Sequence, residues 1–135
     1  MSASNIVFDH VHLISKDPKS AAEWYADKLA GEIIGSAEVR GAPQVIIAFE
    51  GATIIVRGQR TGEEAAGKPD LQWGTDHFGF SVKGNFDGFC DDLKKNGVTF
   101  TLDPVDFGPN VRIAFIEAPD NVSIEVTYNK FRTIE

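Results

Sequence analysis

The chain has 135 residues, enough for a hydrophobic core of ordinary size, and 42% of them are hydrophobic. Its formal net charge of -7 argues against binding to nucleic acid or to an anionic membrane surface. No apolar run reaches the roughly 18 residues that a membrane-spanning helix needs. The single cysteine, Cys90, allows no internal disulfide and no cysteine metal cluster. Since the first residues also lack the features of a signal peptide, we expect a cytoplasmic protein with a small-molecule partner.

The first half of the chain is predicted to form a strand, a helix and three further strands. The strand lies in FDHVHLIS, and the helix should begin at Pro18, after the N-cap residue Asp17, and close at Gly31. Turn residues separate the three strand-like runs that follow, which are GEIIGSAEV, QVIIAFE and ATIIVRG. We assign residues 6–59 to this first module.

The second half repeats this order. A polar, glycine-rich linker, residues 60–74, leads to DHFGFSV, which begins at Asp76 and matches DHVHLIS of the first half. A second helix should follow Asn85 and end at Gly97. The remaining strand-like runs are GVTFTLDPV, VRIAFIE and VSIEVTYN, and the second module covers residues 75–130.

These elements predict an α+β fold in which residues 1–135 form one domain with a pseudo-twofold internal repeat. Each βαβββ module buries one face of its sheet under its own helix. Since neither module alone covers its other sheet face, the two should pack together. We therefore expect a curved mixed sheet around a metal-binding cleft.

Two histidines in the first strand raise the question of which one binds metal. Strand side chains alternate, so His10 and His12 point to the same face. Superposing the halves places His10 on His77 and Ile55 on Glu125, whereas His12 meets no second histidine. A carboxylate in an apolar strand is costly to bury unless a cation meets it. The sequence therefore predicts a metal site at His10, His77 and Glu125, with His12 as an acid/base group or a residue behind the ligands.

These residues resemble the vicinal oxygen chelate superfamily, which includes glyoxalase I, methylmalonyl-CoA epimerase, fosfomycin-resistance enzymes, extradiol dioxygenases and bleomycin-resistance proteins. The resemblance rests on DHVHLISKDPKSAAEWYADKLAGEII, on DHFGFSV through FDGFCDDLKKNGVTF, and on IAFIEAPDNVSIEV. It implies the same three metal ligands and a homodimer. Glyoxalase I has a fourth ligand, a glutamate, where this chain has Ile55. Bleomycin-binding relatives lack the metal ligands that this chain keeps.

Two imidazoles and one carboxylate leave about three positions of an octahedral ion open, which suits Fe(II) or Mn(II), with Zn(II) or Ni(II) as alternatives. A small substrate with vicinal oxygens would bind through both of them. Arg57 shares the face of Ile55, where it would either pair with a substrate carboxylate or phosphate or lie exposed at the strand end. Further hydrogen-bond donors to substrate on these faces are Thr53, Ser123 and Thr127.

Three functions remain open. The first is a ring-cleaving dioxygenase of the extradiol type, favoured by the open ligand set and the missing fourth ligand, with His12 as proton acceptor or as a stabiliser of bound oxygen. The second is a glyoxalase-like lyase or isomerase, or a fosfomycin-resistance-like transferase, with His12 as base. The third is a small-molecule-binding protein without catalysis. Metal content separates the third function from the others, and oxygen consumption separates the first from the second.

Overall fold

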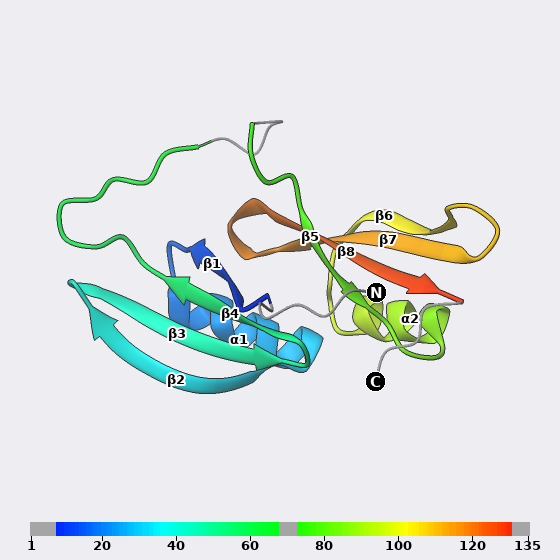
Figure 1. Ribbon diagram of the computed structural model, residues 1–135, viewed down its shortest axis with the longest axis horizontal. Helices are drawn as coiled ribbons and strands as arrows, with labels where there is room; N and C mark the ends of the chain where they lie inside the picture. Colours follow the sequence, from blue (N-terminus) through cyan, green and yellow to red (C-terminus); the bar gives the residue numbers. More distant parts are fainter. Residues whose placement is uncertain (1–7, 68–72, 131–135) are drawn as a thin grey trace. The chain divides into compact units, whose positions relative to one another are not determined.

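The computed structural model describes residues 8–67 and 73–130 (Figure 1). The chain divides into two compact units, Met1–Gly67 and Lys68–Glu135. The boundary between the units falls inside the predicted linker, residues 60–74, of which 68–72 lie outside the described residues. Each unit contains one sheet and one long helix, so each is described in turn.

The first unit holds a four-stranded mixed sheet in the order β1-β4-β3-β2. Its first strand runs parallel to its last, and the other neighbours are antiparallel. In chain order the elements are β1 (His10–Ile14), α1 (Pro18–Leu29), β2 (Glu32–Val39), β3 (Ala42–Phe49) and β4 (Ala52–Arg57).

The second unit has the same arrangement, with its sheet in the order β5-β8-β7-β6. Here β5 runs parallel to β8, and the other neighbours are antiparallel. Its elements are β5 (Phe78–Ser81), α2 (Phe86–Lys95), β6 (Phe100–Asp106), β7 (Val111–Ala118), the short 3-10 turn η1 (Pro119–Asn121) and β8 (Val122–Asn129). The predicted pair of βαβββ modules is therefore confirmed, whereas the shared cleft stays a prediction.

Helix α1 begins where the sequence predicts and ends one residue early. The Asp17 side chain accepts a hydrogen bond from the Ser20 N–H at 3.1 Å and caps the first turn. At the other end Ala30, not Gly31, takes the left-handed conformation, with φ of 60°. Gly31 is needed for a different reason, because a Cβ there would lie 2.5 Å from Cγ2 of Ile47. The glycine thus lets the chain pass close to β3.

Helix α2 follows the prediction at both ends. Asn85 caps it by accepting a hydrogen bond from the Gly88 N–H at 3.0 Å. Gly97 follows the helix with φ of 81°, a left-handed conformation that favours glycine. Within the described residues, neither helix is long and apolar enough to cross a membrane.

Each helix covers one face of its own sheet (Figure 1). In β4 the side chains of Ile54 and Val56 are buried with those of α1, while Ile55 between them is only partly buried. In β8 the same alternation buries Ile124 and Val126. The face of each sheet away from its helix is therefore free to carry polar side chains, and it is there that the predicted site residues lie.

Candidate functional site

Strands β1 and β4 set the order of the residues on the open face of the first unit. The parallel register pairs His10 with Thr53 and His12 with Ile55. Both histidines are exposed on the same face of β1, and their ring centroids are 6.1 Å apart. Alternate residue pairs along these strands therefore carry the candidate ligand His10 first and the candidate acid/base group His12 second.

Strands β5 and β8 repeat this register in the second unit. Phe78 pairs with Ile124 as Val11 pairs with Ile54, and Gly79 pairs with Glu125. By the same pairing, the second-unit equivalent of Ile55 is Glu125. The superposition of the two halves that the sequence predicts is thus reproduced in the strand pairing.

The second unit brings two candidate ligands into contact. Nε2 of His77, which directly precedes β5, lies 3.0 Å from Oε1 of Glu125. The two side chains are 31% and 25% exposed, so both are accessible yet partly shielded from water. The His77 ring also packs edge-on against Phe115 of β7, with centroids 4.9 Å apart. These contacts hold the imidazole and the carboxylate in one place.

A second carboxylate lies behind His77. Nδ1 of the imidazole is 2.7 Å from Oδ2 of Asp76. This hydrogen bond raises the pKa of His77; burial opposes the rise, and the hydrogen bond and charge of Glu125 add to it. The imidazole therefore lies between two acceptors, and both of its nitrogens have a carboxylate partner.

The same carboxylate–imidazole pair occurs in the first unit, where Nδ1 of His10 lies 2.7 Å from Oδ2 of Asp9. Metal-binding histidines usually donate their second ring N–H to a carboxylate or carbonyl, which fixes the ring and directs the other nitrogen at the metal. Asp9 and Asp76 were not among the residues predicted from the sequence. The available signal was the Asp-His dipeptide that opens both copies of the repeat.

His12 lies in a different electrostatic environment. Burial lowers its pKa, and the positive charges of Arg57 and Arg60 lower it further, followed by that of His10. The imidazole is therefore held in its neutral form, which can accept a proton. The pKa of His77 is shifted in the opposite direction, because its neighbours Asp76 and Glu125 are carboxylates.

Of the three predicted ligands, His77 and Glu125 come together within the second unit, and His10 lies in the first. Among the described residues, no group of three His, Cys, Asp or Glu side chains is close enough to hold a metal ion. The three-ligand site draws on both units, so it stays a prediction.

Three of the four predicted substrate-binding side chains, those of Thr53, Thr127 and Arg57, already have a partner within their own unit. The Thr53 hydroxyl donates to the carbonyl oxygen of Asp9 at 3.3 Å, and the Thr127 hydroxyl donates to that of Arg112 at 3.4 Å. Ser123 lies beside Glu117 in the register of β7 and β8. Arg57 is only 13% exposed and forms an ion pair with Glu63.

Comparison with known proteins gives a consistent family assignment. The family model described as the Glyoxalase/Bleomycin resistance protein/Dioxygenase superfamily matches residues 7–126. No curated protein matches the chain.

Several solved structures share the fold. A glyoxylase/bleomycin resistance protein/dioxygenase domain from Frankia sp. EAN1pec has a TM-score of 0.75 at 23% identity, covering 95% of this chain and 99% of that one. A glyoxalase family protein from Bacillus cereus has a TM-score of 0.77 at 16% identity, covering 94% and 96%. A glyoxalase/bleomycin resistance protein/dioxygenase from Alicyclobacillus acidocaldarius has a TM-score of 0.67 at 21% identity, covering 98% and 96%.

Proposed function

The chain belongs to the glyoxalase/bleomycin resistance protein/dioxygenase superfamily, and from this premise we propose that it is a divalent-metal-dependent enzyme, specifically a ring-cleaving dioxygenase. One observation carries the proposal. His77 and Glu125 meet at 3.0 Å with Asp76 behind the imidazole, an arrangement suited to holding a metal ion. The equivalent Asp9–His10 pair supplies the same kind of ligand from the first unit.

The donors fit a hard or borderline divalent ion. His10, His77 and Glu125 would supply two imidazole nitrogens and one carboxylate, the set typical of Fe(II) oxygenases. When bound, such an ion would accept two neighbouring oxygens of a substrate and stabilise their negative charge. Ile55 occupies the place equivalent to Glu125 and offers no further ligand, which favours a dioxygenase over a glyoxalase-type reaction.

Other residues on the open sheet faces of the two units would bind the substrate or accept a proton from it. His12, with its neutral imidazole, would accept a proton from a substrate hydroxyl. Thr53, Ser123 and Thr127 would donate hydrogen bonds from their hydroxyl groups. Arg57 would bind a charged group on the substrate, two residue pairs beyond His12 along the strands and on the same face.

The test begins with elemental analysis of protein purified without chelators, followed by catechol turnover under air and under nitrogen. We expect bound iron or manganese and oxygen consumption that follows metal content. Turnover that proceeds equally under nitrogen would replace the dioxygenase by a lyase, isomerase or transferase. Protein that takes up no iron, manganese, zinc or nickel even after loading would refute the metal-dependent enzyme altogether.

A further inference from the structure

A pocket of about 290 Å³ opens on the first unit, where β1 and β4 end. Its wall combines the last residues of these strands with the segment that follows β4. The lining residues are Ile14, Arg57, Gln59, Glu63, Glu64 and Ala65. The volume is near the lower end of the range for small-molecule sites, so the pocket suits a small ligand.

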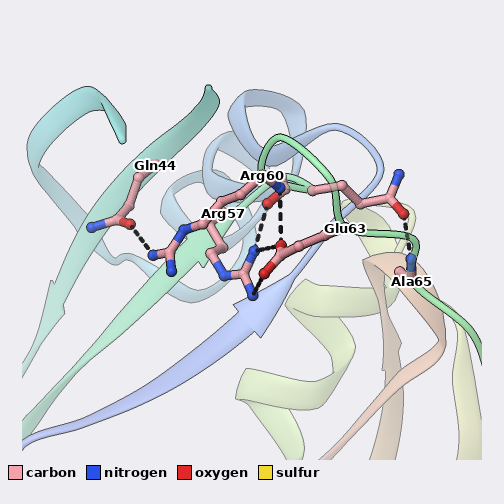
Figure 2. Close-up of polar contacts among 7 residues, drawn as sticks. Gln44, Arg57, Arg60, Glu63 and Ala65 are labelled. Carbon is pink, nitrogen blue, oxygen red and sulfur yellow. Dashed lines mark hydrogen bonds and ion pairs between the residues drawn. The ribbon is translucent and has the colours of Figure 1, made fainter. Parts of the chain in front are cut away.

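The cation in this pocket is already paired with a carboxylate. One oxygen of Glu63 accepts a hydrogen bond from Nη1 of Arg57, and the other accepts one from Nη2 at 3.4 Å (Figure 2). Arg57 is 13% exposed, whereas Glu63 is 43% exposed. The hydrogen bond from Arg57 lowers the pKa of Glu63, so the carboxylate is charged at neutral pH. A fixed, largely buried guanidinium thus faces a carboxylate that lies at the surface.

Glu63 belongs to a segment without helix or strand, residues 58–67. The first oxygen of Glu63 also accepts the Arg60 N–H at 2.9 Å (Figure 2). The Ala65 N–H donates to the Gln59 side chain. The Thr61 N–H donates to the carbonyl oxygen of Arg40 at 3.0 Å, which anchors the segment independently of Glu63. Glu63 can therefore leave Arg57 without detaching the whole segment.

We propose that this pocket binds the carboxylate of a small organic acid through Arg57, and that Glu63 occupies Arg57 when no acid is bound. An exchange of one carboxylate for another keeps the guanidinium paired throughout. This matters because an unpaired, largely buried charge is strongly destabilising. Glu63 also shows which ligand geometry Arg57 accepts, namely a planar group with two oxygens.

The neighbouring residues suggest an acid with an apolar body. Ile14 pairs with Arg57 in the strand register and is 48% exposed, so it offers an apolar wall beside the guanidinium. The next pair on the same face of the strands contains His12, two residues back from Ile14 and so about 7 Å away at the usual rise of a strand. An aromatic ring that bears the carboxylate spans this distance. The acid would therefore extend from Arg57 along the open face toward His12.

This inference deepens the proposed function by naming a substrate class, and in that sense it rests on it. The pocket, however, consists of residues of the first unit alone. Its test measures binding without metal and without turnover. Failure of the carboxylate site and failure of the metal assignment are therefore distinguishable.

Benzoate is a suitable probe, with benzamide as its uncharged counterpart, and calorimetry on the full chain measures the binding. We expect Glu63→Gln to tighten benzoate binding by about two- to fivefold, the range spanned by exposed ion pairs. Arg57→Gln should abolish benzoate binding. Glu32→Gln, at an exposed position on β2, removes the same charge elsewhere and should leave the affinity unchanged.

A second measurement follows the Arg60 amide by NMR, because that amide loses its Glu63 acceptor when benzoate replaces the side chain. Its resonance should shift on titration, whereas that of Thr61 should stay in place. Equal tightening by Glu63→Gln and Glu32→Gln would reduce the effect to net charge and overturn the inference. It would also be overturned if benzamide bound as well as benzoate, if Glu63→Gln bound no benzoate, or if inorganic phosphate bound more tightly.

Discussion

The two units share one arrangement of strands and helix but differ in the side chains on their open sheet faces. The strand orders correspond element by element, and Val11–Ile54 and Phe78–Ile124 are equivalent pairs. The buried faces carry nearly the same chemistry, since Ile54 and Val56 of β4 match Ile124 and Val126 of β8. The core of each unit is thus preserved between the two halves of the chain.

The open faces differ at the positions where chemistry is expected. Ile55 stands where the second unit has Glu125, and His12 where it has Gly79. A Cβ at Gly79 would lie 2.9 Å from the backbone oxygen of Glu125, so the second unit has no room for a side chain at the place of His12. At these two positions the first unit therefore presents an imidazole, and the second presents a carboxylate. Duplication conserves the packing and leaves the open face free to diverge.

The largest effect should come from removing the predicted metal ligands of the second unit. We expect His77→Ala and Glu125→Ala each to reduce metal occupancy to background, because each removes a direct donor while the core beneath is untouched. His10→Ala should do the same from the first unit. Elemental analysis after metal loading and dialysis measures the occupancy, and circular dichroism checks that the fold survives.

Glu117→Gln is the matched control for this experiment, since Glu117 is exposed in β7 and pairs with Ser123, two residues before Glu125. It should leave occupancy unchanged. Full occupancy in the double variant His10→Ala/His77→Ala would show that the metal site lies elsewhere.

The second-largest effect should come from His12, whose equivalent position in the second unit holds Gly79. We expect His12→Ala to retain the metal and to lower turnover by about 10²–10⁴-fold, the usual contribution of a general acid or base. Metal content and turnover rate, measured on the same sample, distinguish a metal ligand from a general acid or base. Loss of metal from His12→Ala with retention in His10→Ala would exchange the assignments of the two histidines.

A smaller loss of metal affinity should follow when the aspartate beside either histidine is replaced. Asp76→Asn and Asp9→Asn remove the carboxylates behind His77 and His10, and each should weaken metal binding by about 10–100-fold. Competition with a coloured chelator measures the affinity. If only one of the two substitutions weakens binding, the histidine of the other unit is not a ligand.

How much of this could be predicted from sequence depended on whether a feature repeats. Local patterns predict the two helices and their caps at Asp17 and Asn85. The repeat predicts that Ile55 and Glu125 are equivalent positions. Asp9 and Asp76 were visible in the repeated Asp-His dipeptide, but they were not singled out because they adjoin the strands rather than alternate within them.

The contact between Arg57 and Glu63 had no sequence signal. Glu63 lies in an irregular segment, where no periodicity fixes the direction of a side chain. The closing residue of α1 was also beyond local rules, because Gly31 is required by the side chain of Ile47, which lies on another element. Contacts made by irregular segments, or between two elements, are set by packing in three dimensions, and a periodic sequence pattern does not predict them.

A substitution can make the two open faces more alike. Ile55→Glu would place a carboxylate at the position equivalent to Glu125, beside His12 in the register. We expect divalent-metal affinity to rise by about tenfold, or 1.4 kcal/mol, because the metal gains a donor. Oxygen-dependent turnover should fall at the same time. A folded Ile55→Glu variant with unchanged affinity and oxygen reactivity would place residue 55 away from the metal.

The smallest effect concerns the buried faces, where the units are most alike. Cys90 lies five residues after the cap of α2 and Ala22 five after that of α1, and they are 1% and 0% exposed. Burial raises the pKa of the Cys90 thiol to about 11, with the charge of Asp87 adding to the rise. The thiolate is the reactive form, so at pH 8 about a thousandth of the thiol would be ionised. Iodoacetamide should therefore leave the native protein unmodified at pH 8 and label it in urea, as mass spectrometry would show.

The raised pKa of Cys90 should also make the folded protein less stable at alkaline pH. The unfolded chain ionises Cys90 at a lower pH than the folded chain does, so the unfolded state binds fewer protons between about pH 9 and 11. The free energy of unfolding should fall as the pH rises through that window and should carry no contribution from Cys90 below it. Cys90→Ala, which gives α2 the residue that α1 has at Ala22, should remove this part of the slope. Urea unfolding at pH 8 and pH 10 measures it for both proteins. An identical slope in the variant would mean that the thiol is not shielded by the core as its 1% exposure indicates.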